Sequence, residues 1–552
     1  MGALVRGRDL PSTEDLDRDP GFKSIFDVLR ADLADTRAQH PGAKVTSIDG
    51  VRLFDAEWLR SKQMSFELVG VFNRLDRRAF YPATTLQGSS CGEVRFVFRL
   101  RYATEQGKQP MQFRLPMTLN VVFHASGSDC SAAARAWQSE QGQGAARLAD
   151  WLYAAVRERF VLKSVEVNLQ SVRHQSSMIP SLAGHIEYTM RVFHAVDVTR
   201  ERFEPAPMEN MPDVARLRKD SALRAELLAF LREPATLQAL DTGVLQVPER
   251  FLTRRAISVA PRGLARPSNR PFQQLFSPSD FAGLDLGSTQ SLASPVALLR
   301  RLDGHSCVGC HQSRSIAGFH HVGDDPVSTP RYAALHSGLS AHLRAELARR
   351  RAYVEALARG EAPDEFRPIP ERQGVGTEHG APCGLGDPGL ADWSCAPGLR
   401  CVALEDAEVG ACFAEGSVGE PCEYGVMVGR PRAARDRVAQ VAKHACGAAM
   451  ECASNFSGFP QGSCDTSCDA GVPDRACGDF LDVDAFQNCL RFRQPVAECA
   501  QKHVFQTGLR ACDDAHPCRQ DYVCSRAGPD AGACVPPYFV YPLRLDGYPI
   551  RR

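Results

Sequence analysis

Two cysteines and one histidine stand close together near the middle of the 552-residue chain, in the segment Cys307-Val308-Gly309-Cys310-His311. Thiols and imidazoles are side chains that bind metal ions, and thiols also form covalent bonds through sulfur. Two thiols at this spacing can close a redox-active or structural disulfide, or they can supply half of a zinc site. The adjacent histidine allows one further use.

The five residues match the pattern C-x-x-C-H, and the segment resembles the haem-attachment sequence of c-type cytochromes. The resemblance implies one covalent haem c, whose two vinyl groups form thioethers with Cys307 and Cys310. It also implies that His311 is the proximal ligand of the iron. Because the resemblance covers this short segment only, the disulfide and zinc alternatives stay open.

Histidine is concentrated around the motif. His320 and His321 are the nearest candidates for a sixth iron ligand, because a loop could fold them over the opposite face of the porphyrin. Methionine, the usual sixth ligand of small cytochromes, is not expected, since none occurs between Met211 and Met427. An open sixth position, which would permit peroxide or oxygen chemistry, is the other alternative. Six of the 15 histidines lie within 38 residues: His305, His311, His320, His321, His336 and His342.

Charged residues near the motif have two interpretations. Arg300, Arg301 and Arg314 could pair with the haem propionates, or they could lie at solvated helix ends. The sequence contains no phosphate loop, dinucleotide glycine fingerprint, metalloprotease helix or nucleophile elbow. Five polar residues at or near predicted strands are expected to form a satisfied buried network rather than a catalytic site: Asn73, Arg74, Asp76, Glu93 and Arg95.

The first 300 residues are predicted to form an α+β globular domain built on an antiparallel sheet. Its two cysteines, Cys91 and Cys130, are expected to form a disulfide. Alternation of apolar and polar residues predicts strands at 65–72, 92–102, 117–123, 164–172 and 185–193. Helical spacing predicts helices at 22–33, 145–160 and 223–240.

Three further regions follow this domain, which covers residues 1–300. Residues 301–360 are predicted to be a short helical segment that binds the haem. Residues 361–382 are rich in proline, glycine and charge, and they are predicted to be a linker. Residues 383–552 hold 16 of the 20 cysteines and are predicted to be a region of small disulfide-rich modules.

The cysteines of this last region form a repeat. In each of three units, two cysteines are separated by five residues and followed by a further cysteine, with a glycine two positions before that last one. Four cysteines allow three pairings, so the spacing does not decide the bonds. The units are Cys383, Cys395, Cys401 and Cys412; Cys422, Cys446, Cys452 and Cys464; and Cys512, Cys518, Cys524 and Cys534, with Gly410, Gly462 and Gly532, while Cys468, Cys477, Cys489 and Cys499 form an irregular set.

Composition narrows the class of protein. Lysine plus arginine and aspartate plus glutamate each total 65, so no net charge attracts nucleic acid or an anionic membrane. Twenty cysteines indicate an oxidising compartment, which predicts a periplasmic or extracellular protein. The sequence has no run of about 18 apolar residues that would span a membrane. Its start, MGALVRGRDLPSTED, has no apolar core of a signal peptide, so export is inferred from the cysteines alone.

Three functions are consistent with these patterns. The favoured one is an exported c-type haem protein that transfers electrons or binds haem, with a redox partner or small-molecule substrate that the sequence does not identify. The second is a haem-dependent peroxidase or oxygenase-type enzyme, with the first domain forming a substrate cleft. The third is a secreted structural or adhesive disulfide-rich protein without haem. Whether the protein is an enzyme stays open.

Overall fold

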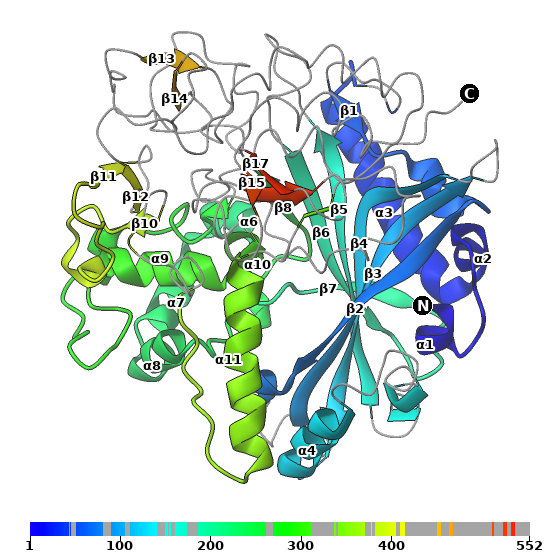
Figure 1. Cartoon of the computed structure of the whole chain (residues 1–552), viewed down its shortest axis with the longest axis horizontal. Coiled ribbons are helices and arrows are strands. Elements are labelled where there is room, and N and C mark those ends of the chain that lie inside the picture. The colour runs from blue at the N-terminus through cyan, green and yellow to red at the C-terminus, as the bar shows by residue number, and fades with distance from the viewer. Residues whose placement is uncertain are drawn as a thin grey trace.

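The computed structural model describes a sheet unit, a helical unit and short disulfide-linked hairpins (Figure 1). Among the residues that it describes, no helix is both long and apolar enough to cross a membrane. These residues are 1–43, 45, 51–80, 90–104, 111–127, 129–140, 150–152, 154–155, 160–173, 186–260, 269–311, 336–337, 341–369, 377, 381–403, 409–413, 450–453, 463–466, 511–512, 523–526 and 532–535.

Within the described residues, an antiparallel sheet of eight strands organises the first half of the chain (Figure 1). Its main path runs in the order β2-β3-β4-β5-β6-β7, while β1 pairs with β5 and β8 pairs with β6. All five predicted strands are present, so the α+β class with an antiparallel sheet is confirmed. The strands are β1 (Arg52–Leu53), β2 (Met64–Arg74), β3 (Ser90–Thr104), β4 (Met111–Ser126), β5 (Phe160–Arg173), β6 (Ile186–Ala195), β7 (Phe203–Ala206) and β8 (Ala256–Ala260).

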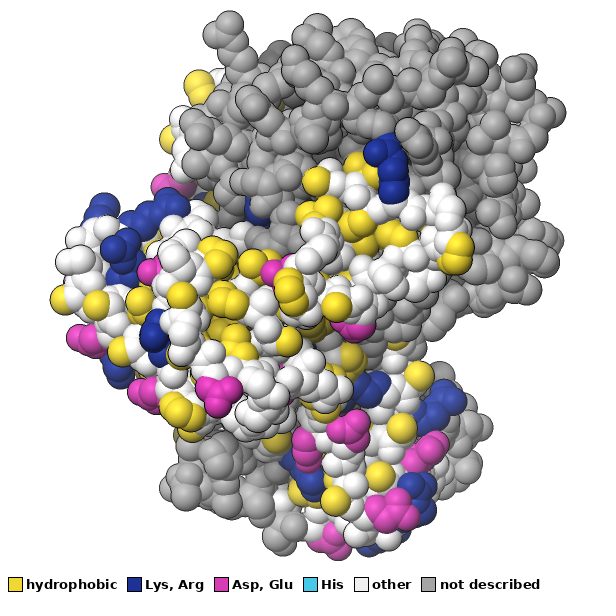
Figure 2. Space-filling view, turned by 90° about the vertical axis from the view of Figure 1, so that its left-hand side faces the viewer, with side chains coloured by type: hydrophobic (Ala, Val, Ile, Leu, Met, Phe, Trp, Pro, Cys, Tyr) yellow, Lys and Arg dark blue, Asp and Glu magenta, His cyan; other side chains and the backbone are white. Residues whose placement is uncertain are grey.

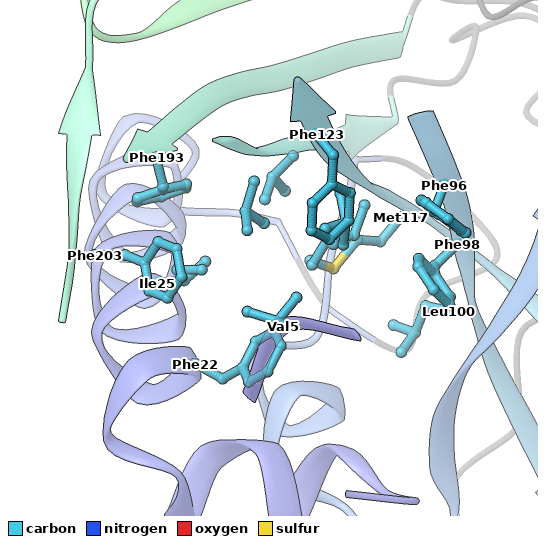
Figure 3. Close-up of a cluster of buried hydrophobic side chains, with 14 of the residues drawn as sticks. Val5, Phe22, Ile25, Phe96, Phe98, Leu100, Met117, Phe123, Phe193 and Phe203 are labelled. Carbon is cyan, nitrogen blue, oxygen red and sulfur yellow. The ribbon is translucent and has the colours of Figure 1, made fainter. Parts of the chain in front are cut away.

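One face of this sheet is apolar and forms the main core. Along β3, Val94, Phe96 and Phe98 are buried in that core, whereas Glu93 and Arg95 alternate with them and lie on the opposite face. The second face of the sheet therefore carries polar side chains at these positions of β3. Figure 3 shows the aromatic rings that meet in the core: Phe22, Phe96, Phe98, Phe123, Phe193 and Phe203.

Helix α3 (Pro20–Gln39) covers the apolar face (Figure 1). It begins where the Asp19 carboxylate accepts hydrogen bonds from the backbone N–H groups of Gly21 at 3.0 Å and Phe22 at 3.3 Å. Its buried apolar residues recur every three or four positions: Phe22, Ile25, Phe26, Leu29 and Leu33. The other helices of this unit are α1 (Gly2–Arg6), α2 (Thr13–Arg18), η1 (Ala56–Arg60), η2 (Leu75–Phe80) and α4 (Cys130–Glu140).

A second hydrophobic cluster, between residues 217 and 302, belongs to the helical unit. The single helix predicted at 223–240 is two helices, because Pro234 has no N–H with which to continue the first one. Pro234 instead occupies the first turn of the second helix. The predicted helix at 145–160 lies mostly outside the described residues. The elements are α6 (Val214–Lys219), α7 (Ser221–Leu231), α8 (Pro234–Thr242), η3 (Glu249–Phe251), η6 (Pro278–Phe281) and α9 (Pro295–His305).

Figure 2 shows the side of the molecule that carries the helical unit. Over the described part of this side, acidic and basic side chains are interspersed, and apolar side chains lie scattered among them. This distribution agrees with the equal totals of acidic and basic residues in the sequence. No single-sign surface for nucleic acid is formed by the described residues on this side.

Helix α11 (Ala341–Ala358) leads the chain back from the motif to the sheet unit. Tyr353 and Leu357 are buried in the main core, and the helix packs against α4 (Figure 1). The segment predicted to be a linker also makes contacts. Ile369 packs with Ala297 of α9. The backbone N–H of Arg367 donates a hydrogen bond to the carbonyl oxygen of Thr242 at 2.9 Å. The predicted domain boundaries remain predictions.

Three disulfides are formed by the described cysteines. Cys91 is bonded to Cys130, as predicted, and this bond joins β3 to α4. Further along the chain, Cys383 is bonded to Cys401 and Cys395 to Cys412, so the first unit pairs its first cysteine with its third and its second with its fourth. The strands and helix of this region are η7 (Pro388–Leu390), β10 (Pro382–Cys383), β11 (Arg400–Ala403), β12 (Gly410–Phe413), β13 (Met450–Ala453), β14 (Ser463–Thr466), β15 (Ala511–Cys512), β16 (Val523–Arg526) and β17 (Gly532–Val535).

The cysteine repeat corresponds to a repeated hairpin. The third and fourth cysteines of each unit are direct cross-strand partners: Cys401 with Cys412, Cys452 with Cys464, and Cys524 with Cys534. In the first and third units, the glycine two positions before the last cysteine also lies opposite the first cysteine: Gly410 lies opposite Cys383, and Gly532 lies opposite Cys512. The reason for glycine is steric, because a Cβ on Gly410 would lie 2.4 Å from the carbonyl oxygen of Val402.

Because the strand registers of the three hairpins match, the other units are predicted to share the connectivity of the first. Peptide mapping without reduction should therefore find Cys512 bonded to Cys524 and Cys518 bonded to Cys534. A bond between Cys512 and Cys534 would contradict the shared connectivity. The peptides that contain the Cys383–Cys401 bond provide the internal control.

Candidate cofactor site around Cys307 and Cys310

The motif forms its own short helix, α10 (Cys307–His311), directly after α9. Ser306 separates the two helices, and its hydroxyl accepts a hydrogen bond from the Gly309 N–H at 3.1 Å, while its carbonyl accepts one from the Cys310 N–H at 2.9 Å. Ser306 therefore caps the new helix at its start. A Cβ on Gly309 would lie 1.9 Å from the carbonyl oxygen of Asp303, so only glycine allows α10 to pack this closely on the end of α9.

Val308 fixes the other side of α10 to the sheet. Its side chain is fully buried, and its carbonyl accepts a hydrogen bond from the Asn269 side-chain amide at 3.4 Å. The carbonyl oxygen of the same Asn269 side chain accepts from the N–H of Val259 in β8 at 3.0 Å. A completely buried asparagine thus ties the motif to a strand, which restricts how the two cysteines can move.

Three methionines pack around this anchor. Met190, Met208 and Met211 form one buried cluster with Val308, and Cys307 packs against the same cluster. Methionine was not expected near the motif, because none occurs between Met211 and Met427. The fold nevertheless brings three methionines from earlier in the sequence to the motif. Their soft, flexible side chains fill the irregular space between α10 and the sheet.

Cys307 and Cys310 are both reduced, and neither forms a disulfide. The Cys307 thiol donates a hydrogen bond to the backbone carbonyl of Glu209 at 3.2 Å. Burial, together with the nearby Glu209 and Glu166 carboxylates, raises the pKa of Cys307 far above its ordinary value. Burial also raises the pKa of Cys310, an effect that the positive charge of Arg367 partly offsets. Both groups are therefore protonated thiols at neutral pH.

These thiols do not have the lowered pKa that is typical of a redox-active CxxC pair, and the described side chains complete no zinc site with them. A redox-active pair needs a thiolate with a lowered pKa, whereas both of these pKa values are raised. Among the described side chains, no set of three metal-ligating groups includes either cysteine. The sulfurs that do cluster within 4.8 Å are those of Cys383, Cys395 and Cys412, and each is already part of a disulfide.

His305, at the end of α9, lies two positions before the motif. Burial, together with the charges of Arg301, Arg367 and Arg77, holds the pKa of its imidazole well below the ordinary value. His305 is therefore neutral at physiological pH, and a neutral imidazole can donate one hydrogen bond through its N–H and accept one through its other ring nitrogen. Of the histidines near the motif, it is the one whose side chain the structure describes next to α10.

A buried charge network connects the motif to the polar face of the sheet. The Glu209 carboxylate forms an ion pair with Arg77, and Arg77 forms a second one with Glu93 at 3.1 Å. Glu93 is completely buried and also accepts from Arg95 at 2.8 Å and Lys163 at 2.7 Å. Although burial alone would raise the pKa of Glu93, these cations hold it well below the ordinary value. Glu93 and Arg95 thus form the satisfied network that the sequence predicted.

A second group of charges, here called the arginine cluster, comes from three distant parts of the chain. It is centred on Asp76, whose carboxylate lies 2.9 Å from Arg74 at the end of β2 and 2.7 Å from Arg349 of α11. Arg367 lies 4.0 Å from the same carboxylate. The cluster consists of Arg74, Arg349, Arg350 and Arg367 with Asp76 and Glu346.

The arginines expected beside the haem are used otherwise or fall outside the described residues. Arg301 is buried and donates to the backbone carbonyls of Leu240 at 3.1 Å, Asp241 at 2.8 Å and Arg367 at 2.5 Å. Arg300 is also buried, so neither side chain lies at a solvated helix end. Arg314 lies outside the described residues.

The structure brings together only some of the predicted ligands. Cys307 and Cys310 lie one turn apart on α10, and His311 closes that helix, although its side chain is not among those described. His320 and His321 lie outside the described residues. Sequence reasoning named Arg74 and Asp76 as part of a buried polar network but missed the other members of the arginine cluster. A signal for three of those was the spacing of Glu346 from Arg349 and Arg350, three and four positions apart on a predicted helix.

The third disulfide unit is joined to the segment that follows the motif. Strand β9 (His336–Ser337) pairs with β16, with His336 opposite Arg526 and Ser337 opposite Ser525. The strands therefore run in the order β15-β17-β16-β9 in one small sheet. This pairing connects a disulfide hairpin near the end of the chain to the histidine-rich segment beyond α10.

Comparison with known proteins gives no independent indication of function. No protein-family model matches the chain. No curated protein and no solved structure matches it either.

The buried carboxylates predict a steep loss of stability in acid. The pKa values of Asp76, Glu93 and Glu346 are all lowered in the folded protein, so their stabilising contribution is present above the ordinary carboxyl pKa of about 4 and is lost as the pH falls below it. Replacing Glu93 by Gln should cost about 3–5 kcal/mol at pH 7, because it leaves three cations without their shared carboxylate.

Urea unfolding of Glu93→Gln at pH 7 and pH 4 measures both effects. The variant should be less stable than the wild type at pH 7, and the difference should shrink at pH 4. Glu355→Gln, on the exposed side of α11, is the matched control and should change neither value. An equal loss of stability at both pH values would contradict the electrostatic account.

Proposed function

We propose that this protein is an exported c-type haem protein that transfers electrons, with haem attached at Cys307 and Cys310 and with His311 as proximal ligand. One observation carries the proposal. Of the eight cysteines whose side chains the structure describes, six form disulfides and these two do not. In an oxidising compartment, a pair of thiols at this spacing would be expected to oxidise unless other chemistry uses them.

The surroundings of the pair fit a haem. The helix places the two thiols one turn apart, as thioether formation with the two vinyl groups requires. Gly309 and Asn269 fix that helix to α9 and to β8, which gives the cofactor a rigid support. When bound, the haem supplies one-electron redox chemistry.

The disulfides themselves indicate an oxidising compartment. We propose that this compartment is the periplasm or the extracellular space, where c-type attachment and disulfide formation are compatible. The partner would be a redox protein or a small molecule. The hairpin pairing of β9 with β16 supports this assignment, because it makes the disulfide region part of the same assembly as the haem segment.

One observation favours a haem-dependent peroxidase or oxygenase-type enzyme as the second candidate. The neutral imidazole of His305 lies close to arginines next to the motif, and such groups could donate hydrogen bonds to a peroxide or oxygen ligand and stabilise negative charge on it. A high-spin ferric spectrum and turnover of peroxide would support the enzyme. A six-coordinate, low-spin spectrum in both oxidation states would select electron transfer.

Expression of the full chain in a host with a haem-attachment pathway tests the cofactor. The wild type should keep its Soret absorption after denaturation and acid-acetone extraction, because thioether bonds survive both treatments. Cys307→Ala combined with Cys310→Ala should lose the retained colour completely, and His311→Ala should shift the spectrum. Gln312→Ala, next to the motif, is the matched control and should behave as the wild type.

Colour that is removed from the wild type by extraction would contradict covalent attachment. Retained colour in the double cysteine variant would contradict the assignment of these two residues. A colourless wild type from this host would favour the third alternative, a structural or adhesive protein without haem.

A further inference from the structure

Three polar side chains on the sheet, here called the polar patch, have buried oxygen atoms without hydrogen-bond partners. Asn120 lies on β4, and Ser164 and Asn168 lie on β5. Within the part of the chain that the structure describes, nothing forms a hydrogen bond with Asn120 Oδ1, Ser164 Oγ or Asn168 Oδ1. Ser164 is 1% exposed and Asn168 is 7% exposed. Because buried polar atoms are nearly always paired, three unpaired ones in one place indicate a missing partner.

The strand register brings these three side chains together. Core residues flank Asn120 and Asn168 along their strands, so both side chains project from the second face of the sheet. Asn120 is directly opposite Glu166, and Glu166 lies between Ser164 and Asn168 on β5. Asn120 is therefore a diagonal neighbour of both, at the distance of about 7–8 Å that is typical of such pairs. One small molecule can contact all three.

The sheet face around the polar patch retains access to solvent. Glu166 and Arg95 form an ion pair at 3.2 Å, and their side chains are 24% and 20% exposed. Asn120 is half-buried as a residue, although its Oδ1 is not accessible. Next to it on the same face, Val97 and Val122 are buried. A few polar groups among apolar side chains, beside accessible surface, are the usual composition of a small-molecule site.

The charges around the polar patch balance, so a bound molecule needs no net charge. Among the described groups, each cation is paired with a carboxylate. Hydrogen bonding therefore remains as the means of recognition. A hydroxyl group can donate to an amide oxygen, and it can donate to or accept from a serine hydroxyl. The cations are Arg77, Arg95 and Lys163, and the carboxylates are Glu93, Glu166 and Glu209.

The polar patch lies next to the strand that supports the motif. Asn168 is directly opposite Met190 on β6, and Glu166 is opposite Val192. Met190 belongs to the buried cluster against which Val192 and Cys307 both pack. Neighbouring strands are about 4.8 Å apart. A molecule on the patch would therefore lie one strand away from the support of Cys307.

We propose that Asn120, Ser164 and Asn168 bind a small neutral molecule that carries hydroxyl groups on an apolar body. The hydroxyl groups pair with the three buried oxygen atoms, and the apolar body contacts Val97 and Val122. This inference goes beyond the proposed haem function, because the polar patch binds its ligand whether or not a haem is attached.

Calorimetric titration of the full-length chain with resorcinol tests the binding. Resorcinol carries two hydroxyl groups on a neutral ring, whereas 1,3-dimethoxybenzene has the same ring and oxygens but no donors. Resorcinol should bind at least about tenfold more tightly, because only its hydroxyl groups can donate to the amide oxygens.

Asn168→Leu removes one unpaired amide at similar side-chain volume. It should weaken resorcinol binding about tenfold, yet it should leave the Tm of the ligand-free chain unchanged or raised, because no hydrogen bond is lost. Ser164→Ala is a second variant with the same expected pattern. Asn73→Leu is the matched control. Its amide oxygen accepts from the Leu75 N–H at 2.8 Å, so this variant should lower the Tm and keep the affinity for resorcinol.

Several outcomes would overturn the proposal. If Asn168→Leu lowers the Tm as Asn73→Leu does, an internal partner such as an ordered water already satisfies the amide. Equal affinity for the two ring compounds, no binding of resorcinol, or unchanged affinity in both Asn168→Leu and Ser164→Ala would also contradict it. The mass of the same preparation reports on the haem separately, so either proposal can fail while the other stands.

Discussion

The contact between Gly309 and the carbonyl of Asp303 is the constraint on which the site depends. A Cβ at position 309 would overlap the Asp303 carbonyl oxygen, so α10 can pack this closely on the end of α9 only with glycine there. This packing places the two cysteines between the helical unit and the sheet. Ser306 caps the new helix and Asn269 fastens it to β8. The position of both thiols therefore follows from one glycine and two polar side chains.

Charge is the second organising force around this junction. The polar face of the sheet and α11 bury several arginines, and most of them are held by carboxylates that are themselves buried. Networks of this kind stabilise a fold weakly when complete and cost several kcal/mol when one member is lost. Burial nevertheless lowers the pKa of several arginines around this junction, including Arg301, Arg350 and Arg367.

Local patterns in the sequence predicted the local structure well. Alternation located all five predicted strands. The Cys91–Cys130 bond was predicted because these are the two cysteines of the first domain. The cysteine repeat marked the three units in which the structure describes a hairpin. The pairing of Cys383 with Cys401 could not be predicted, because the spacing of the four cysteines is compatible with all three possible connectivities. The prediction of one helix at 223–240 followed the helical periodicity and overlooked Pro234, which divides that segment into two helices.

The contacts of the site depend on residues that are far apart in the chain. Arg74, Arg350 and Arg367 meet only because α11 returns to the end of β2, and no periodicity within one segment encodes that meeting. The methionines around Val308 lie upstream of the motif, where a search for ligands along the following segment does not find them. The C-x-x-C-H motif could be recognised from the sequence because haem attachment requires a fixed local spacing of its residues.

The mass of the intact protein tests the central claim most directly. Full-length chain from a host competent in haem attachment should be about 616 Da heavier than the polypeptide, since the thioether bonds keep the cofactor through denaturation. A mass that corresponds to the polypeptide alone, with Cys307 and Cys310 joined to each other, would contradict the account.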